Sequence, residues 1–558
     1  MEYIVIIVGI VISLIVWSLI SERKQKARLR QGIINEWGQI PQEEYTSEKF
    51  ESIKEFYKSR QDDRYDVDDI TWNDLDMDEI YMLINNTQSS LGEEYLFSLL
   101  KKPSFSDEEL KERDRLIRFF LGNEDKRIAL QLLLRKMGKL THISVYKYIN
   151  LLDNHKIESN IPHYFMAFGL IISFGLLFIN PALGAVLILV FFANNIYQYY
   201  QKKAVIENYL TVFAYILRLL QCSQDIEKLG LSEIKAYTEN LKNDREAFKS
   251  FKTGSIVLSS QNPNGNLIDA ILDYGRMLFH IDLIKFNSML SILNKNRDGL
   301  NRLFTNIGFL DSMIAIASFR KYLDYYCEPE LSKSSKPMIS VEDLYHPLLE
   351  NPIPNSISQD SSALITGSNA SGKSTFIKTL AINAILAQTT YTSISRRYKA
   401  SYFAIFSSMA LRDNIFSNES YYIVEIKSLK RILDHANDEV PLLCFIDEVL
   451  RGTNTLERIA ASSRILSSLA SKNTLVFAAT HDIELTHILE ESYSNYHFQE
   501  HICDNKILFD YKLHSGRAVS RNAIKLLELL GYSNDIIKDA EQAVDEFLQD
   551  GEWKVIHK

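Results

Sequence analysis

The stretch SALITGSNASGKSTFIKTLAINAILA, residues 362–387, decides the fold of the C-terminal half of this 558-residue chain. It holds the pattern G-x-x-x-x-G-K-[ST] between a short apolar run, which predicts a strand, and a longer one, which predicts a helix. Glycines allow positive φ, so successive backbone N–H groups and the helix N-terminus can surround an anion. The pattern predicts a phosphate-binding loop made of Gly367, Ser368, Asn369, Ala370, Ser371, Gly372, Lys373, Ser374 and Thr375.

Two side chains of this loop have separate tasks. We expect Lys373 to reach the β- and γ-phosphates of ATP, and the Ser374 hydroxyl to bind Mg²⁺. The flanking strand and helix supply the context that a phosphate-binding loop requires.

Two later apolar runs also end in polar residues. LLCFIDEV (442–449) ends in Asp447 and Glu448, and LVFAATHD (475–482) contains His481. Asp447 suits outer-sphere binding of Mg²⁺, and Glu448 suits the base or positioner of an attacking water. His481, at a strand tip beside a nucleotide, can sense the γ-phosphate. Short apolar runs that alternate with helical patterns predict strand–helix units and a largely parallel sheet.

Together these elements resemble the ATPase domain of the MutS family of DNA mismatch repair proteins. ITGSNASGKST is similar to that family's P-loop, with Asn369 at a typical position. DEVLRGTNT (447–455) is similar to the family's D-E-x-G-R-G-T-x-T, with Leu450 in place of the usual Gly, and ATHDIELT (479–486) also follows the family pattern. The resemblance implies an ATPase that uses ATP and Mg²⁺.

The resemblance also implies roles for residues outside these motifs. SNESYYIVEI (417–426) looks like the family's signature loop, in which Ser417 would contact the γ-phosphate bound by the opposite subunit. Asn418 and Glu419 replace the usual Gly and Arg there. Tyr511 falls where the family has an aromatic group that stacks on adenine; the alternative is a tyrosine on a strand surface.

The similarity extends to both sides of the ATPase motifs. TQSSLGEEYLFSLLKKP (87–103) and GFLDSMIAIASF (308–319) resemble the start and the end of the family's helical core. SRNAIKLLELLGYSNDIIKDA (520–540) resembles its C-terminal helical dimerisation element. These likenesses imply a homodimer, with DNA as the family's partner. We expect the family's aromatic-x-Glu wedge to be missing, so that any DNA binding is structure-selective or non-specific rather than mismatch-reading.

The N-terminus carries an apolar segment that predicts a membrane anchor over residues 1–21. Residues 3–20 contain no charge and, as a helix, are about as long as a bilayer core is thick. Basic residues follow the segment directly, so it reads as an uncleaved anchor that leaves the remainder in the cytoplasm. The alternative is a buried core helix. The basic residues are Arg23, Lys24, Lys26, Arg28 and Arg30.

A second apolar region predicts a transmembrane helical hairpin over residues 164–200. Apolar runs at 164–179 and 182–193 flank Asn180-Pro181, which is a turn signal, and tyrosines and lysines follow the second run. Each arm is short, so a core hairpin or a shallow re-entrant pair are the alternatives.

We therefore expect a multidomain chain with a mainly α-helical core and transmembrane helices, followed by an α/β P-loop ATPase domain of the ABC/MutS type. The core is expected in two parts, at 31–160 and 201–335, the ATPase domain at 338–520 and the dimerisation element at 521–548. The 46% hydrophobic and 24% charged fractions are ordinary for a globular protein. The net charge of −9 argues against a strongly basic DNA-binding module. The four cysteines have neither zinc-site nor disulfide spacing, which fits a cytoplasmic body.

The leading functional hypothesis is a membrane-anchored, MutS-like ATPase, located at the cell membrane with its ATPase and helical core in the cytoplasm. ATP binding and hydrolysis at composite dimer sites would close and open a helical clamp, by family analogy on DNA. One alternative is an ABC-type membrane ATPase or transporter-like scaffold without a DNA role. Another is a scaffold whose nucleotide site only regulates assembly.

Overall fold

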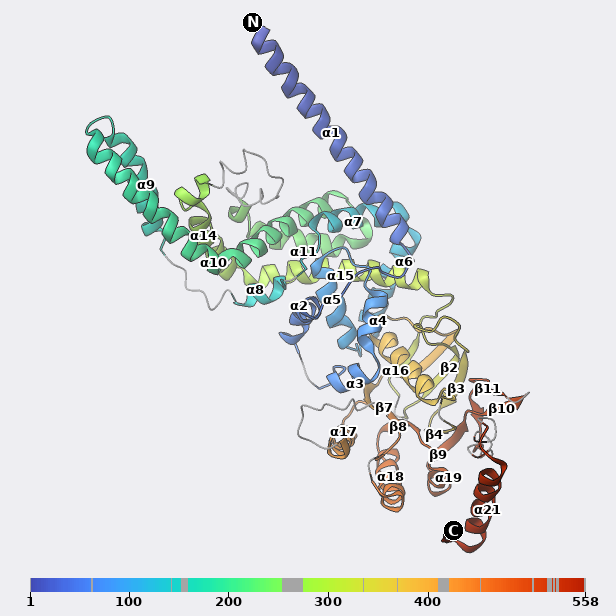
Figure 1. Cartoon of the computed structure of the whole chain (residues 1–558). Coiled ribbons are helices and arrows are strands. Elements are labelled where there is room, and N and C mark those ends of the chain that lie inside the picture. The colour runs from blue at the N-terminus through green and yellow to red at the C-terminus, as the bar shows by residue number, and fades with distance from the viewer. Residues whose placement is uncertain are drawn as a thin grey trace. The chain divides into compact units, whose positions relative to one another are not determined.

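The structure of the chain is a computed structural model (Figure 1). It describes residues 2–61, 64–141, 143–151, 159–252, 274–334, 336–368, 370–409, 421–451, 453–503, 506–518, 524, 527 and 531–555. The chain forms two compact units. Unit 1 consists of residues 1–62, 81–101 and 111–324, and unit 2 consists of residues 63–80, 102–110 and 325–558.

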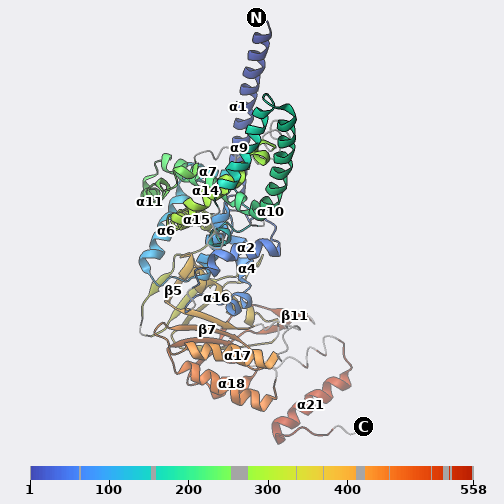
Figure 2. The same ribbon diagram turned by 90° about the vertical axis from the view of Figure 1, so that its left-hand side faces the viewer.

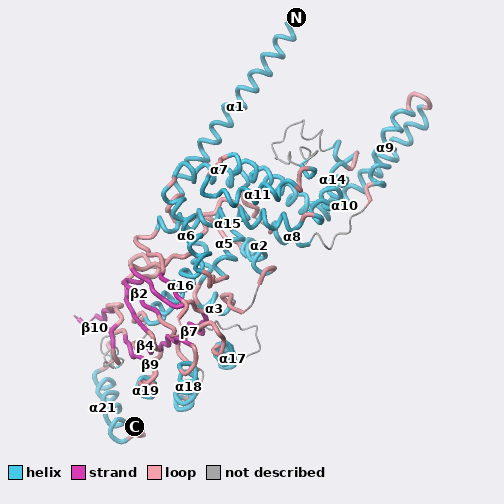
Figure 3. Tube along the Cα trace, turned by 180° about the vertical axis from the view of Figure 1, so that it is seen from behind, coloured by secondary structure: helices cyan, strands magenta, loops and turns pink. Residues whose placement is uncertain are grey.

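Unit 1 is helical. Its α-helices are α1 (Glu2–Glu36), α2 (Ser47–Lys58), α5 (Ser90–Lys101), α7 (Glu124–Met137), α8 (Val145–Leu151), α9 (Ile161–Leu176), α10 (Pro181–Lys228), α11 (Lys235–Glu246), α14 (Ile281–Lys295) and α15 (Arg297–Tyr322). Short 3₁₀ turns lie at Ser232–Ile234 and Ser250–Lys252. Two more helices, α4 (Met77–Ile84) and α6 (Asp107–Gly122), contain residues of both units. The strands all belong to unit 2 (Figure 3).

The core of unit 1 is built around the pairing of α15 with α5. The Asp311 side chain of α15 is fully buried and lies at the N-terminus of α5. It accepts hydrogen bonds from the backbone N–H groups of Gln88 (3.0 Å) and Ser89 (2.9 Å) and from the Ser89 hydroxyl (2.6 Å). A carboxylate satisfies the unpaired N–H groups of a helix N-terminus, which fixes the two helices in register.

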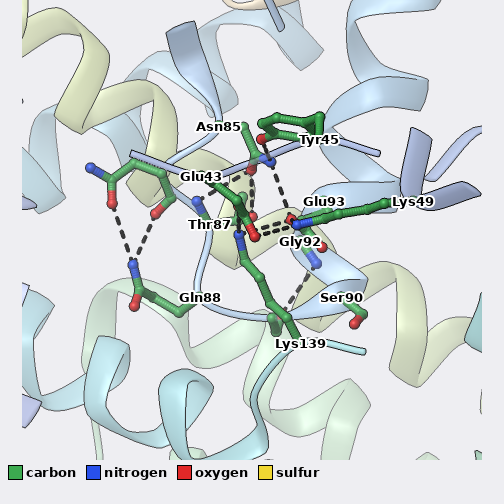
Figure 4. A network of polar contacts seen from close by, with 12 residues as sticks. Glu43, Tyr45, Lys49, Asn85, Thr87, Gln88, Ser90, Gly92, Glu93 and Lys139 are labelled. Atoms are coloured by element: carbon green, nitrogen blue, oxygen red, sulfur yellow. Dashed lines mark hydrogen bonds and ion pairs between the residues drawn. The ribbon is translucent and has the colours of Figure 1, made fainter. Parts of the chain in front are cut away.

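A buried network of charges joins other parts of unit 1 (Figure 4). Glu93 of α5 lies 2.8 Å from the Lys139 ammonium and 3.3 Å from that of Lys49. Both lysines also pair with Glu43, and Asn85 donates to Glu93. Two carboxylates thus meet two ammonium groups, and this balance allows four charges to be withdrawn from water.

Unit 2 is an α/β assembly with mixed sheets. Its main sheet has six strands in the order β12-β9-β4-β8-β7-β6, parallel except for β12. A second sheet has the order β1-β5-β2-β3, and β10 pairs with β11 as a hairpin. The helical N-terminal part and the α/β part that the sequence predicted are both confirmed.

The elements of unit 2 have the following bounds. Strands are β1 (Glu330–Ser332), β2 (Ile339–Leu344), β3 (Asn355–Gln359), β4 (Ser362–Thr366), β5 (Arg397–Ser401), β6 (Ala404–Ser408), β7 (Leu442–Asp447), β8 (Thr474–Ala479), β9 (Tyr493–His497), β10 (Glu500–Cys503), β11 (Lys506–Phe509) and β12 (His514–Ser515). Helices are α3 (Asp69–Asp74), α16 (Lys373–Thr389), α17 (Tyr421–His435), α18 (Thr455–Ala470), α19 (Ile483–Ile488) and α21 (Asn534–Asp550). Helix α16 lies on one face of the main sheet, and α17 and α18 lie side by side on the other (Figure 2).

The short helix α3 covers the outer edge of the main sheet. The Ser407 N–H donates to the Thr71 hydroxyl (3.0 Å), and the Met409 N–H donates to the Asp74 carboxylate (2.9 Å). The Ser407 hydroxyl also donates to Asp74 (2.7 Å). These contacts satisfy the edge strand β6, which would otherwise expose donors to another chain. They explain why a segment from the N-terminal half belongs to unit 2.

The apolar segments of unit 1 are helical. Among the described residues, one helical stretch, Pro181–Lys203, is long and apolar enough to cross a membrane, and the apolar helix α9 is shorter. The backbone of residues 2–36 is a single helix, but most side chains before residue 20 lie outside the described part of the chain. The anchor at 1–21 therefore stays a prediction.

Candidate functional site

The predicted phosphate-binding loop lies at the carboxyl end of β4, which is an interior strand of the main sheet. Strand β4 is fully buried between β9 and β8, and α16 begins at Lys373 directly after the loop. Gly367 and Gly372 have φ of +145° and +109°. A Cβ on Gly367 would lie 2.7 Å from the Phe498 carbonyl oxygen, so only glycine fits there. Asn369 lies outside the described residues.

The Lys373 ammonium is held by the loop itself. It donates to the carbonyl oxygens of Gly367 and Ser368, at 2.8 Å in both cases. Burial lowers the pKa of Lys373, although the charges of Asp447 and Glu448 act in the opposite direction. Among the described residues this buried cation is hydrogen-bonded to neutral carbonyls, so it gains from the arrival of an anion, which is the condition for binding phosphate.

A cavity of about 650 Å³ opens above this loop. Its size is that of a small-molecule or cofactor site. The loop residues that line it are Ser368, Ala370, Ser371, Gly372, Lys373, Ser374 and Thr375. Glu448, His481 and Tyr511 line it as well, so most of the residues singled out in the sequence meet in one place. The segment from Leu344 to Asn355 supplies further lining residues.

Glu448 lies at the centre of a charged cluster on the cavity wall. Its carboxylate accepts from His481 Nε2 at 3.0 Å and pairs with Arg451. Burial raises the pKa of Glu448, but the hydrogen bond from His481 and the charges of Arg451 and Lys373 outweigh burial and hold it below its ordinary value. Glu448 is therefore an ionised carboxylate at neutral pH, as a base or a water-positioning group must be.

Asp447, the last residue of β7, has an unsatisfied oxygen. Its Oδ1 atom is buried and has no hydrogen-bond partner in the part of the chain that the structure describes. The buried Ser371 hydroxyl likewise has no hydrogen-bond partner among the described residues. Buried polar atoms without partners call for an explanation, and an ion bound at the site is one. A carboxylate and the Ser374 hydroxyl are groups that fit Mg²⁺, which takes few protein ligands and completes its shell with phosphate and water oxygens.

Comparison with known proteins identifies the relatives of this arrangement. The family model "MutS domain V" matches residues 363–548, which include the phosphate-binding loop, Asp447, Glu448 and His481. The human protein "MutS protein homolog 4" is 32% identical over 286 residues, covering 48% of this chain and 30% of that protein. "DNA mismatch repair protein MutS" of Leptospira interrogans is 28% identical over 292 residues, covering 50% of this chain and 34% of that protein.

Residues 363–548 of the chain thus match the fifth domain of the MutS family. The resemblance that the motifs carried is thereby confirmed. The matches span about a third of the length of these relatives. A third relative, "DNA mismatch repair protein MSH3" of Candida albicans, is 26% identical over 339 residues, covering 54% of this chain and 32% of that protein.

Leu450 stands where the MutS pattern has glycine, and it has to adopt a backbone conformation that favours glycine. Leu450 has φ of +60° and Glu448 has φ of +55°, a backbone region that favours glycine. The Leu450 side chain is buried in the core, only 2% exposed, so packing offsets the strained backbone. The Leu450 N–H donates to the Glu425 carboxylate of α17.

Glu425 is a residue that the motifs did not single out. It is 4% exposed, and burial raises its pKa although the N–H groups of Leu450 and Arg451 act in the opposite direction. Its second oxygen, Oε2, is buried without a hydrogen-bond partner among the described residues. Glu425 thus ties α17 to the backbone that carries Glu448. A possible sequence signal was its place in the signature stretch 417–426, but no residue spacing predicts a bond to a backbone N–H.

Tyr511 lies beside the phosphate-binding loop. It is 45% exposed, and its ring lies 3.4 Å from the position of a Cβ on Gly372. Asn355 holds this segment because its side chain donates to the Tyr511 carbonyl (3.0 Å) and accepts from the Leu513 N–H (2.8 Å). The ring is therefore available at the cavity. Ser417, the predicted trans contact, lies outside the described residues.

Proposed function

We propose that this MutS-family chain binds ATP with Mg²⁺ in the cavity above the phosphate-binding loop and hydrolyses it. The observation that carries the proposal is that one cavity is lined both by an ionised Glu448 and by a buried Lys373, whose hydrogen bonds in the described part of the chain go to carbonyl oxygens. Ser374 and Asp447 would hold Mg²⁺, which supplies positive charge to the phosphate oxygens.

The side chains divide the reaction between them. Lys373 exchanges its carbonyl partners for phosphate oxygens, which are stronger acceptors because they are charged. Glu448 accepts a proton from, or orients, the attacking water. His481 donates to Glu448 and fixes its orientation, and Tyr511 offers its exposed ring face to the adenine.

The proposal extends to two chains acting together. A homodimer would complete each site with Ser417 of the opposite subunit, and ATP would bind the closed state of the helical clamp better than the open one. The relatives named as DNA mismatch repair proteins support DNA as what the clamp closes on. The net charge of −9 favours a local contact surface over a general affinity for DNA.

We further propose that the chain is held at the cell membrane, with its ATPase and helical core in the cytoplasm. The apolar N-terminal segment and the apolar stretch Pro181–Lys203, of which only 17% is buried, support this. Nothing in the described residues favours the alternative of an ABC-type transporter or transporter-like scaffold over this proposal.

Lys373→Ala tests the nucleotide site. We expect the altered full-length chain, solubilised in detergent, to lose ATP binding and turnover, whereas the exposed Lys399→Ala control keeps both. Unchanged ATP binding by the Lys373→Ala chain contradicts the assignment of the site.

The dimer and DNA proposals need their own measurements. Mixing Ser417→Ala and Lys373→Ala chains should give an ATPase rate that the separate chains do not predict. DNA binding should increase with ATP and weaken steeply with salt. Absence of binding at low salt, with and without ATP, contradicts the DNA proposal and leaves the ATPase proposal intact.

A further inference from the structure

The hairpin of α9 and α10 is apolar on its outward face. Both helices present large apolar side chains to the surroundings, including Phe165, Phe168, Ile172, Leu189 and Val190, which are all more than half exposed. In a soluble hairpin this face is polar, because only the stripe between the helices is removed from water. An apolar surface on all sides fits hydrocarbon.

Two glycines lie where the two arms pack on each other. A Cβ on Gly169 would lie 2.4 Å from the Phe191 ring, and a Cβ on Gly184 would lie 2.6 Å from the Leu177 nitrogen. Small residues that allow close backbone approach are the usual helix contact in lipid, where no hydrophobic force draws helices together. Much of the large apolar surface of the arms is thereby left to face outward.

The turn between the arms satisfies its own backbone. The N–H groups of Phe178, Ile179 and Asn180 donate to carbonyl oxygens of Gly175 and Leu176, at 2.8–3.2 Å. The Asn180 side chain accepts from the Leu183 N–H (3.2 Å), and the Asn180 carbonyl accepts from the Gly184 N–H (2.9 Å). Pro181 has no N–H to satisfy. Backbone groups without internal partners are expensive in hydrocarbon, and this turn minimises them.

The tip of this hairpin is apolar. In a hairpin that crosses a membrane, the tip emerges into water on the far side. Phe178 is 92% exposed and Ile179 is 82% exposed, and the turn from Leu177 to Pro181 contains no charged residue. If this turn emerged on the far side of a bilayer, both side chains would stand in water.

The opposite end of the hairpin is polar and fixed to unit 1. His163 of α9 and His280 lie with their Nδ1 atoms 3.0 Å apart, and both are buried. The Asn195 carbonyl of α10 lies 3.0 Å from His280 Nε2, and the Tyr199 hydroxyl donates to Asp282 of α14 (2.9 Å). This polar base is followed by exposed tyrosines and by Lys202-Lys203, which suit the level of the lipid headgroups.

The distance from the polar base to the tip decides the mode of insertion. From His163 to Leu176 and from Pro181 to Asn195 the arms contain 14 and 15 residues, so each rises about 20 Å at ~1.5 Å per residue. A bilayer's hydrocarbon core is about 30 Å thick. The hairpin is longer than one leaflet is deep, but too short to bring its tip to the far surface while its base stays among the headgroups.

We propose that residues 161–200 form a re-entrant membrane hairpin, whose ligand is the acyl-chain region of a phospholipid bilayer. The hairpin enters from the face at which its polar base lies, its tip ends within the hydrocarbon, and both arms return to the same face. This rests on the proposed membrane attachment and replaces the transmembrane hairpin with a shallower one. Helix α10 continues from the hairpin as a single helix to Lys228, so the hairpin and the helical core share one rigid element.

Depth-dependent quenching in vesicles tests the proposal. The full-length chain carrying Ile179→Cys is labelled with an environment-sensitive fluorophore and reconstituted in phosphatidylcholine–phosphatidylglycerol vesicles. The labelled unaltered chain gives the background from native cysteines, and Leu456→Cys, at an 80% exposed position of α18, is the control for a label in water. Quenchers are nitroxides on the acyl chains, and iodide either added outside or trapped inside.

We expect acyl-chain nitroxides to quench the label at residue 179, and iodide on neither side to reach it. Phe178→Asp on the labelled chain should shift the insertion equilibrium toward water by about a hundredfold, because a carboxylate deep in the bilayer is costly. Phe178→Leu should leave the quenching unchanged. Together these results support a tip that ends in hydrocarbon.

Three other results overturn it, each differently. Quenching by iodide from the side opposite the ATPase means that the hairpin crosses the bilayer. Quenching by iodide from the ATPase side, in chains that still float with the vesicles, means that the hairpin lies outside the membrane while another segment anchors the chain. If the chains do not float with the vesicles, the proposed membrane attachment itself is wrong.

Discussion

Each unit contains a cluster of charged side chains, and the two differ in how completely they are paired. In unit 1, Glu43, Lys49, Glu93 and Lys139 contact one another within 3.3 Å (Figure 4). In unit 2, Glu448 is paired with His481 and Arg451, yet the adjacent Asp447 keeps a buried oxygen that has no partner among the described residues. A closed network stabilises a fold, whereas an open one leaves an acceptor that a ligand can use. Altering the first cluster should change stability, and altering the second should change chemistry.

Glu448→Gln should give the largest effect. The amide keeps the shape of the side chain but cannot take a proton, so we expect ATP turnover to fall by about a thousandfold. ATP affinity and the free energy of unfolding should stay close to those of the unaltered chain. Steady-state ATPase and nucleotide-binding assays measure the two quantities. Glu484→Gln, an exposed carboxylate in the first turn of α19, is the control.

Unchanged turnover in the Glu448→Gln chain would remove Glu448 from the reaction. A large loss of stability in the same chain would place it with the closed networks and erase the contrast between the clusters.

Lys49→Met should have the opposite signature. The Lys49 side chain is 6% exposed, and its removal leaves the two carboxylates Glu43 and Glu93 with one cation, Lys139. Breaking a buried pair in this way costs about 3 to 5 kcal/mol. Urea unfolding followed by circular dichroism should report the loss, while ATPase activity of the folded chain stays unchanged.

Lys54→Met is the matched control on the same helix. Lys54 pairs with the exposed Glu51, and such surface pairs contribute about 0 to 1 kcal/mol. Equal effects of the two substitutions would show that burial of the network adds nothing.

The cavity also contains a titratable group that should make stability depend on pH. Burial and the nearby Lys378 charge together lower the pKa of His346 to about 4, although Asp76 acts in the opposite direction, whereas the unfolded chain has an ordinary histidine value near 6.5. Between these values the unfolded state binds more protons, so stability is lost as pH falls from about 6.5 to 4, by up to about 3 kcal/mol. His346 Nδ1 accepts the Leu348 N–H, an acceptor that asparagine can also supply. In the His346→Asn chain, the free energy of unfolding should depend less on pH across this range. An unaltered pH dependence would mean that other groups cause it.

The motif-level part of the site was accessible from the sequence because it is contiguous. A strand, a glycine loop and a helix follow one another in 362–387, Asp447 ends its strand, and His481 follows the end of the next one by two residues. Parallel pairing of β4 with β8 and of β8 with β7 then brings these ends to one edge. Local pattern and sheet topology therefore predict the same place.

The parts that the sequence did not predict depend on contacts over long separations with backbone atoms. Thr71 and Asp74 satisfy the edge of β6 more than 330 residues away, through a short polar helix without periodicity. The Asn355 side chain positions Tyr511, which lies 156 residues further along the chain, by donating to the Tyr511 carbonyl oxygen. Any polar side chain can make such bonds, so no residue pattern marks them in advance.

Glu425 shares features of both kinds of cluster, because one of its oxygens is paired and the other has no described partner. Its alteration should give the smallest effect. One oxygen accepts the Leu450 N–H, and the other is buried without a described partner. Glu425→Ala removes a charged acceptor worth about 1.5 to 3 kcal/mol, which frees the strained backbone that carries Glu448. We expect kcat to fall by about tenfold with ATP affinity unchanged, and Glu425→Gln, which keeps an acceptor, to restore most of it. Asp434→Asn, an exposed carboxylate on the same helix, is the control. Equal losses in the alanine and glutamine chains would mean that the charge matters more than the bond, and a fall in ATP affinity would mean that Glu425 shapes the cavity rather than the position of Glu448.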